Sequence, residues 1–293
     1  MRRALALSLP LLFVAAACST GGSTSAGTGV TTSTGPVGGP SSTSADKPTV
    51  KIPATVPTKL VVTDLTPGNG PAAKTGDEVI LHYIGVRSAD GVEFDNSYDR
   101  GEPFSVVLGA GKVIPGWEQG LVGVQAGGRR QMDIPADLAY GDRGSGTVIR
   151  PGDALSFVVD VLAVLPTSTA GEQPAITVAP AANIHEITKT DLVVGTGASP
   201  SNGKKFAAQI MLFRADTGEL LNSTWGSPPV VFDYTSDTNT YPGIIAVAKG
   251  MKVGGRRQSQ VPNSLMFDGK GQSQINLPPN VDVVLVMDLV AVY

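Results

Sequence analysis

An internal repeat with a period of 127 residues is the feature that most constrains this chain. Three segments recur at that separation: residues 127–131 with 254–258, 63–65 with 190–192, and 115–116 with 242–243. Two copies with so long a period indicate a duplicated domain rather than a solenoid. We expect one domain over residues 59–166 and another over residues 182–293. Residues 167–181, which are low in charge, would link them.

The residue pattern within each copy predicts strands and little helix. Residues 79–84 alternate with a period of two, and Leu155, Phe157 and Val159 share one face of a late strand. Asp90-Gly91 predicts a hairpin turn, and only residues 117–122 suggest a helix. Each copy therefore reads as an α+β unit of about 100 residues, an antiparallel sheet that covers one short helix.

Composition narrows the possible functions. The net charge is −3, which argues against general nucleic-acid binding. A single cysteine rules out an internal disulfide framework and a cysteine-based zinc site. Two histidines leave little material for a histidine metal centre. We expect neither a metal nor a cofactor.

The N-terminus has the features of an export signal. Residues 1–17 contain two arginines and then a short apolar run that ends in three alanines before Cys18. A cysteine at this place resembles the lipidated residue of bacterial lipoproteins, and residues 18–58 would form a flexible tether, since residues 19–45 are almost entirely Ser, Thr, Gly and Pro. The alternatives are an ordinary signal with Cys18 as a bystander and a disordered secreted N-terminus.

Five ordered segments of the first copy carry a family resemblance. They are residues 79–85, 94–97, 99–104, 111–117 and 138–144. Together with Phe157 in the last strand, they resemble the FKBP family of peptidyl-prolyl isomerases. The family fold implied is a twisted antiparallel sheet wrapped around a short helix, with a pocket between them.

The resemblance also implies a set of site residues. Catalytic roles transfer to Tyr83, Phe94, Asp95, Trp117, Tyr140 and Phe157. Substrate-binding roles transfer to Arg100, Phe104, Val113, Ile114 and Ile149. By the same resemblance, the Ile114 N–H and the Tyr140 hydroxyl hold peptide carbonyls, and macrolide inhibitors of the FKBP type bind in the pocket. Ser145 and Arg150 depart from residues common in the family, which affects substrate preference more than activity.

The second copy departs from the family pattern at most of these positions. Its counterparts are Ile210 for Tyr83, Leu221 for Phe94, Asn222 for Asp95, Ile244 for Trp117, Phe267 for Tyr140, Leu285 for Phe157, Ser227 for Arg100, and Val230 or Val231 for Phe104. Most replacements are apolar, so the fold can survive while the pocket is lost. The second copy would then be an inactive scaffold or a peptide-binding arm.

These features lead to one expected function and one rival. The expected function is peptidyl-prolyl cis-trans isomerisation of exported polypeptides by a protein anchored outside the cytoplasm through a lipid on Cys18. The rival is a membrane-anchored chaperone or binding protein that keeps the FKBP fold without useful turnover.

Overall fold

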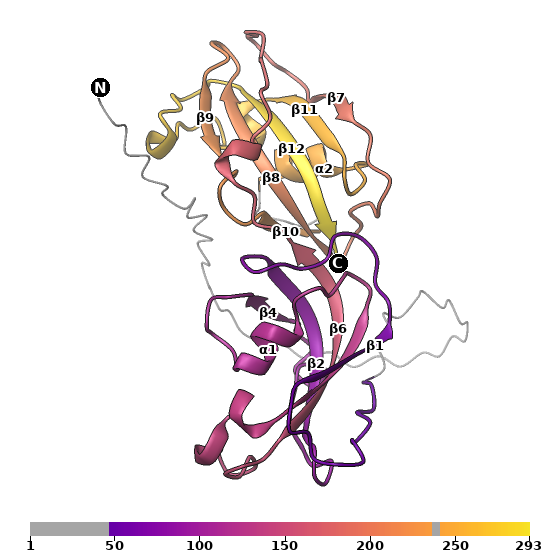
Figure 1. The fold of residues 1–293 in the computed structure, drawn as a ribbon. Helices are drawn as coiled ribbons and strands as arrows, with labels where there is room; N and C mark the ends of the chain where they lie inside the picture. Colours follow the sequence, from indigo (N-terminus) through magenta and orange to yellow (C-terminus); the bar gives the residue numbers. More distant parts are fainter. Residues whose placement is uncertain (1–46, 236–240) are drawn as a thin grey trace, which may run out of the picture. The chain divides into compact units, whose positions relative to one another are not determined.

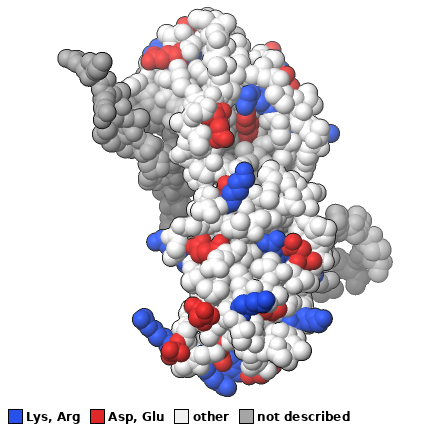
Figure 2. Space-filling model, viewed as in Figure 1, with Lys and Arg blue, Asp and Glu red and all other residues white. Residues whose placement is uncertain are grey.

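A computed structural model describes residues 47–235 and 241–293. The expected signal, Cys18 and the Ser/Thr/Gly/Pro-rich segment lie outside these residues. Among the described residues, no helix has the length and apolar character needed to cross a membrane. On the face shown in Figure 2, acidic and basic side chains of the described residues are interspersed.

The first domain is an antiparallel sheet with one short helix (Figure 1). Its elements are β1 (Val61–Thr66), β2 (Glu78–Arg87), β3 (Glu93–Asn96), β4 (Phe104–Val107), α1 (Pro115–Gly120), β5 (Arg129–Ile134) and β6 (Leu155–Leu165). The strand order is β1-β5-β6-β2-β3, and β4 also pairs with β2. The chain reverses between β2 and β3 at the predicted turn, where Gly91 has a φ of +71°.

The second domain repeats this topology. Its elements are β7 (Thr188–Val193), β8 (Lys204–Arg214), β9 (Leu220–Ser223), β10 (Val230–Tyr234), α2 (Pro242–Ala248), β11 (Arg256–Val261) and β12 (Val283–Val292). The strand order is β7-β11-β12-β8-β10, and β9 also pairs with β8. The strands therefore follow the order of the first sheet, as expected of a duplicated domain. Both domains are mostly strand, with six and seven residues of α-helix in α1 and α2.

Helix α1 begins and ends two residues earlier than the sequence pattern predicts. Pro115 occupies the first turn, where its missing N–H costs no hydrogen bond. A Cβ atom at Gly116 or Gly120 would clash with the Ile134 and Met132 side chains of β5. Glycine at these two positions lets the helix lie directly on the sheet. Trp117, on the same helix, then lies where helix and sheet meet.

The segment expected as a flexible tether through residue 58 has ordered contacts over residues 47–52. Pro48 and Val50 are buried, and Val50 packs against Ile84, Val86 and Val158. Residues 47–52 differ from the preceding Ser/Thr/Gly/Pro run in having two lysines and the aliphatic residues Val50 and Ile52. The expected linker is also docked in part: Val178 is buried among residues of the second domain.

Candidate functional site

The first domain has a cleft of about 450 Å³ beside α1. Its lining residues come from β2, β3, β4, β6, α1 and two loops: Tyr83, Phe94, Asp95, Phe104, Gly111, Lys112, Val113, Ile114, Trp117, Tyr140 and Phe157. The structure thus brings together nine of the eleven residues predicted for the site. Arg100 lies next to the cleft through its contacts with two lining residues.

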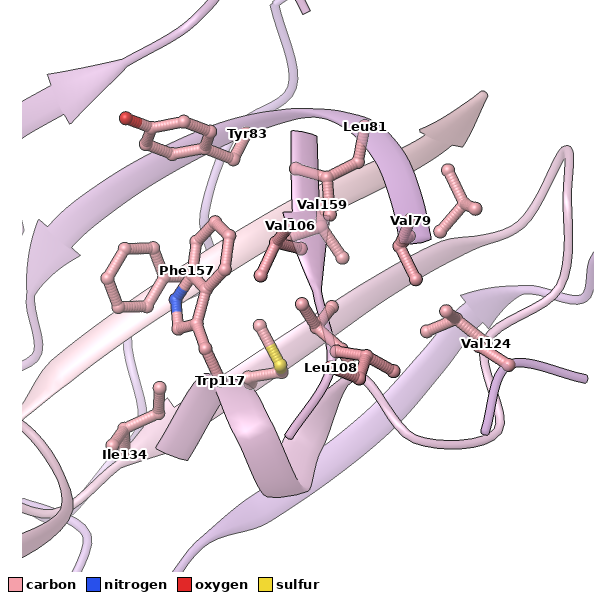
Figure 3. Packing of buried hydrophobic residues seen from close by; sticks show 14 of the residues in the cluster. Val79, Leu81, Tyr83, Val106, Leu108, Trp117, Val124, Ile134, Phe157 and Val159 are labelled. Atoms are coloured by element: carbon pink, nitrogen blue, oxygen red, sulfur yellow. The ribbon is translucent and has the colours of Figure 1, made fainter. Parts of the chain in front are cut away.

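Trp117 is the floor of this cleft. It is only 4% exposed, and it rises from α1 between the aromatic rings of the sheet (Figure 3). Its ring meets those of Tyr83 and Phe157 edge to face, with both centroid separations at 5.2 Å. Phe104 packs the same way at 5.8 Å. Such edge-to-face pairs fix the orientation of the rings as well as excluding water.

Polar groups gather on one wall of the cleft. The Tyr83 hydroxyl donates a hydrogen bond to Asp95 Oδ2. Arg100 donates from Nη1 to Asp95 Oδ1 at 2.5 Å and from Nη2 to the Tyr83 hydroxyl at 2.8 Å. Burial, together with the bond to Asp95, raises the pKa of Tyr83 to about 12. Tyr83 therefore stays a neutral donor at physiological pH, and its direction is set by Asp95 and Arg100.

Two groups at the rim can contact a bound peptide. Tyr140 lines the cleft and is 41% exposed. Among the described residues, none accepts a hydrogen bond from the Ile114 N–H, while the Ile114 carbonyl accepts from Trp117 N at 2.9 Å. The Ile114 N–H and the Tyr140 hydroxyl are thus two hydrogen-bond donors beside the aromatic floor.

Glu118, which was not among the residues predicted from the sequence, orders the loop of residues 109–114 that forms another wall of the cleft. Its two carboxylate oxygens accept from the backbone N–H groups of Gly109 at 2.5 Å and Gly111 at 2.8 Å. This loop contains Val113 and Ile114. The only signal in the sequence is an acidic residue in the first helical turn after a glycine-rich loop.

Ile149, also predicted for the site, belongs to the same apolar cluster as Tyr83, Trp117 and Phe157. It is buried in the core of the first domain and is not among the residues that line the cleft. Its backbone exchanges two hydrogen bonds with Ser145. Ser145 and Arg150, the two departures from the family pattern, are exposed on the same loop.

The counterpart region of the second domain is different. Ile244 and Leu285 fill the core positions that match Trp117 and Phe157. The Asn222 side-chain oxygen Oδ1 accepts a hydrogen bond from the backbone N–H of the next residue, Ser223, at 2.9 Å. Strand pairing also settles the counterpart of Phe104: Phe104 pairs with Leu81, and Val230 pairs with Ala208, which is 127 residues after Leu81.

Comparisons with known proteins agree with the geometry. A family model described as FKBP-type peptidyl-prolyl cis-trans isomerase matches residues 70–162. An FK506-binding protein of Streptomyces anulatus is 50% identical over 123 residues, which cover 41% of this chain and 99% of the relative. A probable FK506-binding protein of Corynebacterium glutamicum is 41% identical over 118 residues, covering 40% of this chain and 98% of the relative.

Among solved structures, the crystal structure of FkpA from Escherichia coli is similar to this chain. It is 42% identical over a match that covers 42% of this chain and 54% of that one, with a TM-score of 0.34.

An aromatic cleft of this kind, with relatives matched over nearly their whole length, defines a prolyl isomerase. The chain belongs to the family of FKBP-type peptidyl-prolyl cis-trans isomerases and is an enzyme of that type.

Proposed function

We propose that the cleft over Trp117 in the first domain is the enzyme's one catalytic site, and that the second domain is a scaffold without turnover. The observation that carries the proposal is the contrast between the repeats. The first domain combines a tryptophan floor with the Tyr83–Asp95–Arg100 group, and the second has Ile244 and Asn222 at the matching positions.

The mechanism follows from the reaction itself. Rotation about a peptide bond must overcome a barrier of about 18–20 kcal/mol, because amide resonance is lost in the twisted state. No σ-bond is made or broken, so the reaction asks for neither a nucleophile nor a proton transfer. A thousandfold acceleration requires about 4 kcal/mol of preferential stabilisation. The twisted amide is less dipolar than the planar one, so a cleft of aromatic rings favours it relative to water.

The polar wall supplies orientation in this mechanism. The Ile114 N–H and the Tyr140 hydroxyl hold carbonyls of the peptide on either side of the bond that rotates. Asp95, kept in place by Arg100 and the Tyr83 hydroxyl, presents its carboxylate on the cleft wall. The substrate proline rests on Trp117, where its ring is shielded from water.

The reciprocal exchange of Asp95 and Asn222 in the full chain tests this assignment. Asp95→Asn keeps the volume and introduces the amide found in the second domain. We expect kcat/KM for an Xaa-Pro peptide to fall about three-fold to ten-fold, since hydrogen bonds to charged groups contribute about 1.5–3 kcal/mol when buried and less when partly exposed. Asn222→Asp should leave activity unchanged. Unchanged activity in Asp95→Asn, or a change in Asn222→Asp, would refute the assignment.

We further propose that the protein acts on exported polypeptides near a membrane. The support is in the sequence: an export signal, a cysteine placed for lipidation and a long uncharged segment before the first domain. Two or more acyl chains hold a protein stably at a bilayer where one does not. Cys18→Ser should therefore release the protein from the membrane fraction and abolish acyl labelling. Equal membrane retention of variant and wild type, without acyl label on either, would contradict a lipid anchor on Cys18.

A further inference from the structure

Residues 47–52 form a strap that is docked on the first domain. Val50 is 8% exposed and packs on Ile84, Val86 and Val158. The Gln131 side chain fixes the backbone of Lys51 at both ends: Gln131 Oε1 accepts from Lys51 N at 3.2 Å, and Gln131 Nε2 donates to Lys51 O at 2.8 Å. The strap is therefore held by the apolar packing of Val50 and by two hydrogen bonds to the Lys51 backbone, independently of its charged end.

The charged end of the strap is Lys47, which bridges two carboxylates. Its Nζ donates to Glu93 Oε1 at 2.8 Å and to Asp99 Oδ2 at 3.0 Å. Asn96 Nδ2 donates to the same two oxygens at 2.6 Å and 2.8 Å, and Asn96 Oδ1 accepts from Asp99 N at 2.7 Å. Two anionic oxygens thus converge on one neutral amide. Without the Lys47 ammonium, only the neutral Asn96 amide would lie between the Glu93 and Asp99 carboxylates. No positive charge would then offset their mutual repulsion.

This cluster is interleaved with the polar wall of the cleft. Glu93 and Asn96 are the ends of β3, and the two residues between them, Phe94 and Asp95, line the cleft. Asp99 immediately precedes Arg100, which bonds Asp95. Repulsion between Glu93 and Asp99 would consequently change the separation of the two chain segments that supply the Asp95–Arg100 pair.

We propose that Lys47 is a positioning residue for the isomerase site: by bridging Glu93 and Asp99 it holds β3 and the following turn in the geometry that pairs Asp95 with Arg100. The proposal rests on the proposed role of the cleft. In agreement with the bridge, hydrogen bonds to Glu93 and Asp99 raise the pKa of Lys47, and the bond from Lys47 lowers the pKa of Asp99.

The second domain offers an internal comparison. Its preceding segment also contacts the hairpin end, but through a neutral bond in which Ser223 Oγ donates to Gln173 Oε1 at 2.6 Å. By strand pairing, the counterpart of Glu93 there is Leu220, which has no charge for a lysine to bridge. The ionic bridge is therefore present in the repeat that has the Asp95–Arg100 pair and replaced in the repeat that lacks it.

Lys47→Met in the full chain tests the proposal, with Lys51→Met as the matched control. Lys51 lies on the same strap, and its contacts to Gln131 use backbone atoms that the substitution leaves in place. Lys47→Arg keeps the charge and serves as the rescue variant. The readouts are kcat and KM for one Xaa-Pro peptide at two ionic strengths, together with the unfolding temperature of each variant in the same buffers.

We expect Lys47→Met to raise KM about three-fold at about 0.01 M salt, where the screening length is about 30 Å, with little change in kcat. Lys47→Arg should restore the wild-type KM, and Lys51→Met should match the wild type. At about 1 M salt, where the screening length is about 3 Å, the repulsion is screened and the difference should close.

Three results would overturn the proposal: a KM in Lys47→Met equal to that of Lys51→Met, no rescue by arginine, or a defect of equal size at both salt concentrations. Asp95→Asn separates this failure from failure of the site. If Asp95→Asn lowers activity and Lys47→Met does not, the strap has no positioning role. If Asp95→Asn has no effect, the cleft assignment itself fails.

Discussion

In both repeats a buried arginine joins the helix to two strands. Arg130 donates from Nη1 to the carbonyls of Gly120 and Val122 at 2.9 Å each, and from Nε to Asp64 at 2.6 Å. In the second domain, Arg257 makes the same three kinds of contact, to Val247 at 2.8 Å, Lys249 at 2.9 Å and Asp191 at 2.6 Å. The neighbouring arginines also match, since Arg129 pairs with Asp160 and Arg256 with Asp288.

The repeats differ where the first domain opens into its cleft. Trp117, Asp95 and Phe157 have become Ile244, Asn222 and Leu285, and the last of these is completely buried. The interactions that hold the helix on the sheet are therefore separable from those that line the site. This separation makes each residue of the second domain a control for its counterpart in the first.

The largest expected difference between the repeats is at the cleft floor. Trp117→Ala in the full chain should lower kcat/KM at least about ten-fold, because the proline loses both its support and its shield from water. It should also destabilise the first domain by about 3–5 kcal/mol, as is typical when a buried tryptophan is truncated. Ile244→Ala should destabilise the second domain and leave kcat/KM within about two-fold of wild type. A protease-coupled isomerisation assay at a temperature where both variants are folded compares the two values of kcat/KM. A larger loss of kcat/KM in Ile244→Ala than in Trp117→Ala would contradict the assignment of the site to the first domain.

A smaller and symmetrical effect is expected at the arginines. Arg130→Met and Arg257→Met should each destabilise their own domain by about 2 kcal/mol, since a charged donor is removed from two carbonyls at the end of a helix. Activity should fall only in Arg130→Met, because α1 carries Trp117. Calorimetry and the isomerisation assay on the two variants check this, and equal loss of activity in both would show that the domains are coupled.

The smallest expected effect is on acid stability. The hydrogen bond from Arg130 lowers the pKa of Asp64 below its ordinary 3.8, and Arg257 does the same for Asp191. Each carboxylate therefore stabilises the fold fully above that value, and the contribution is lost as the pH falls from 3.8 towards the lowered pKa. The stability gap between wild type and either arginine variant should narrow over this range. A gap that stays constant or widens would mean that these pairs do not titrate as described.

Much of the fold could be predicted from the sequence because the repeat and the two-residue alternation report directly on strands. The start of α1 could not, since Pro115-Gly116 also suits a turn, and the close fit of Gly116 against Ile134 is a tertiary contact. The docking of residues 47–52 also depends on a tertiary partner. Val50 is the only strongly buried aliphatic residue of that segment, too weak a pattern to predict an element.

The candidate site followed from resemblance more than from pattern. Tyr83, Asp95 and Arg100 are separated by 12 and 5 residues, and nothing local indicates that their side chains share hydrogen bonds. The sequence also gives no indication that Ile149 and Ser145 exchange two backbone hydrogen bonds. Glu118 and Lys47 support neighbouring segments through contacts that only the folded chain makes.

The number of macrolide molecules bound per chain tests the one-site account most directly. The full chain has two tryptophans, Trp117 and Trp225, so a Trp225→Phe variant reports on the cleft floor alone. Calorimetric titration with FK506 should give one molecule per chain, with a change in Trp117 fluorescence that saturates at the same ratio. Two molecules per chain, or saturable binding without any change in Trp117 fluorescence, would contradict the account.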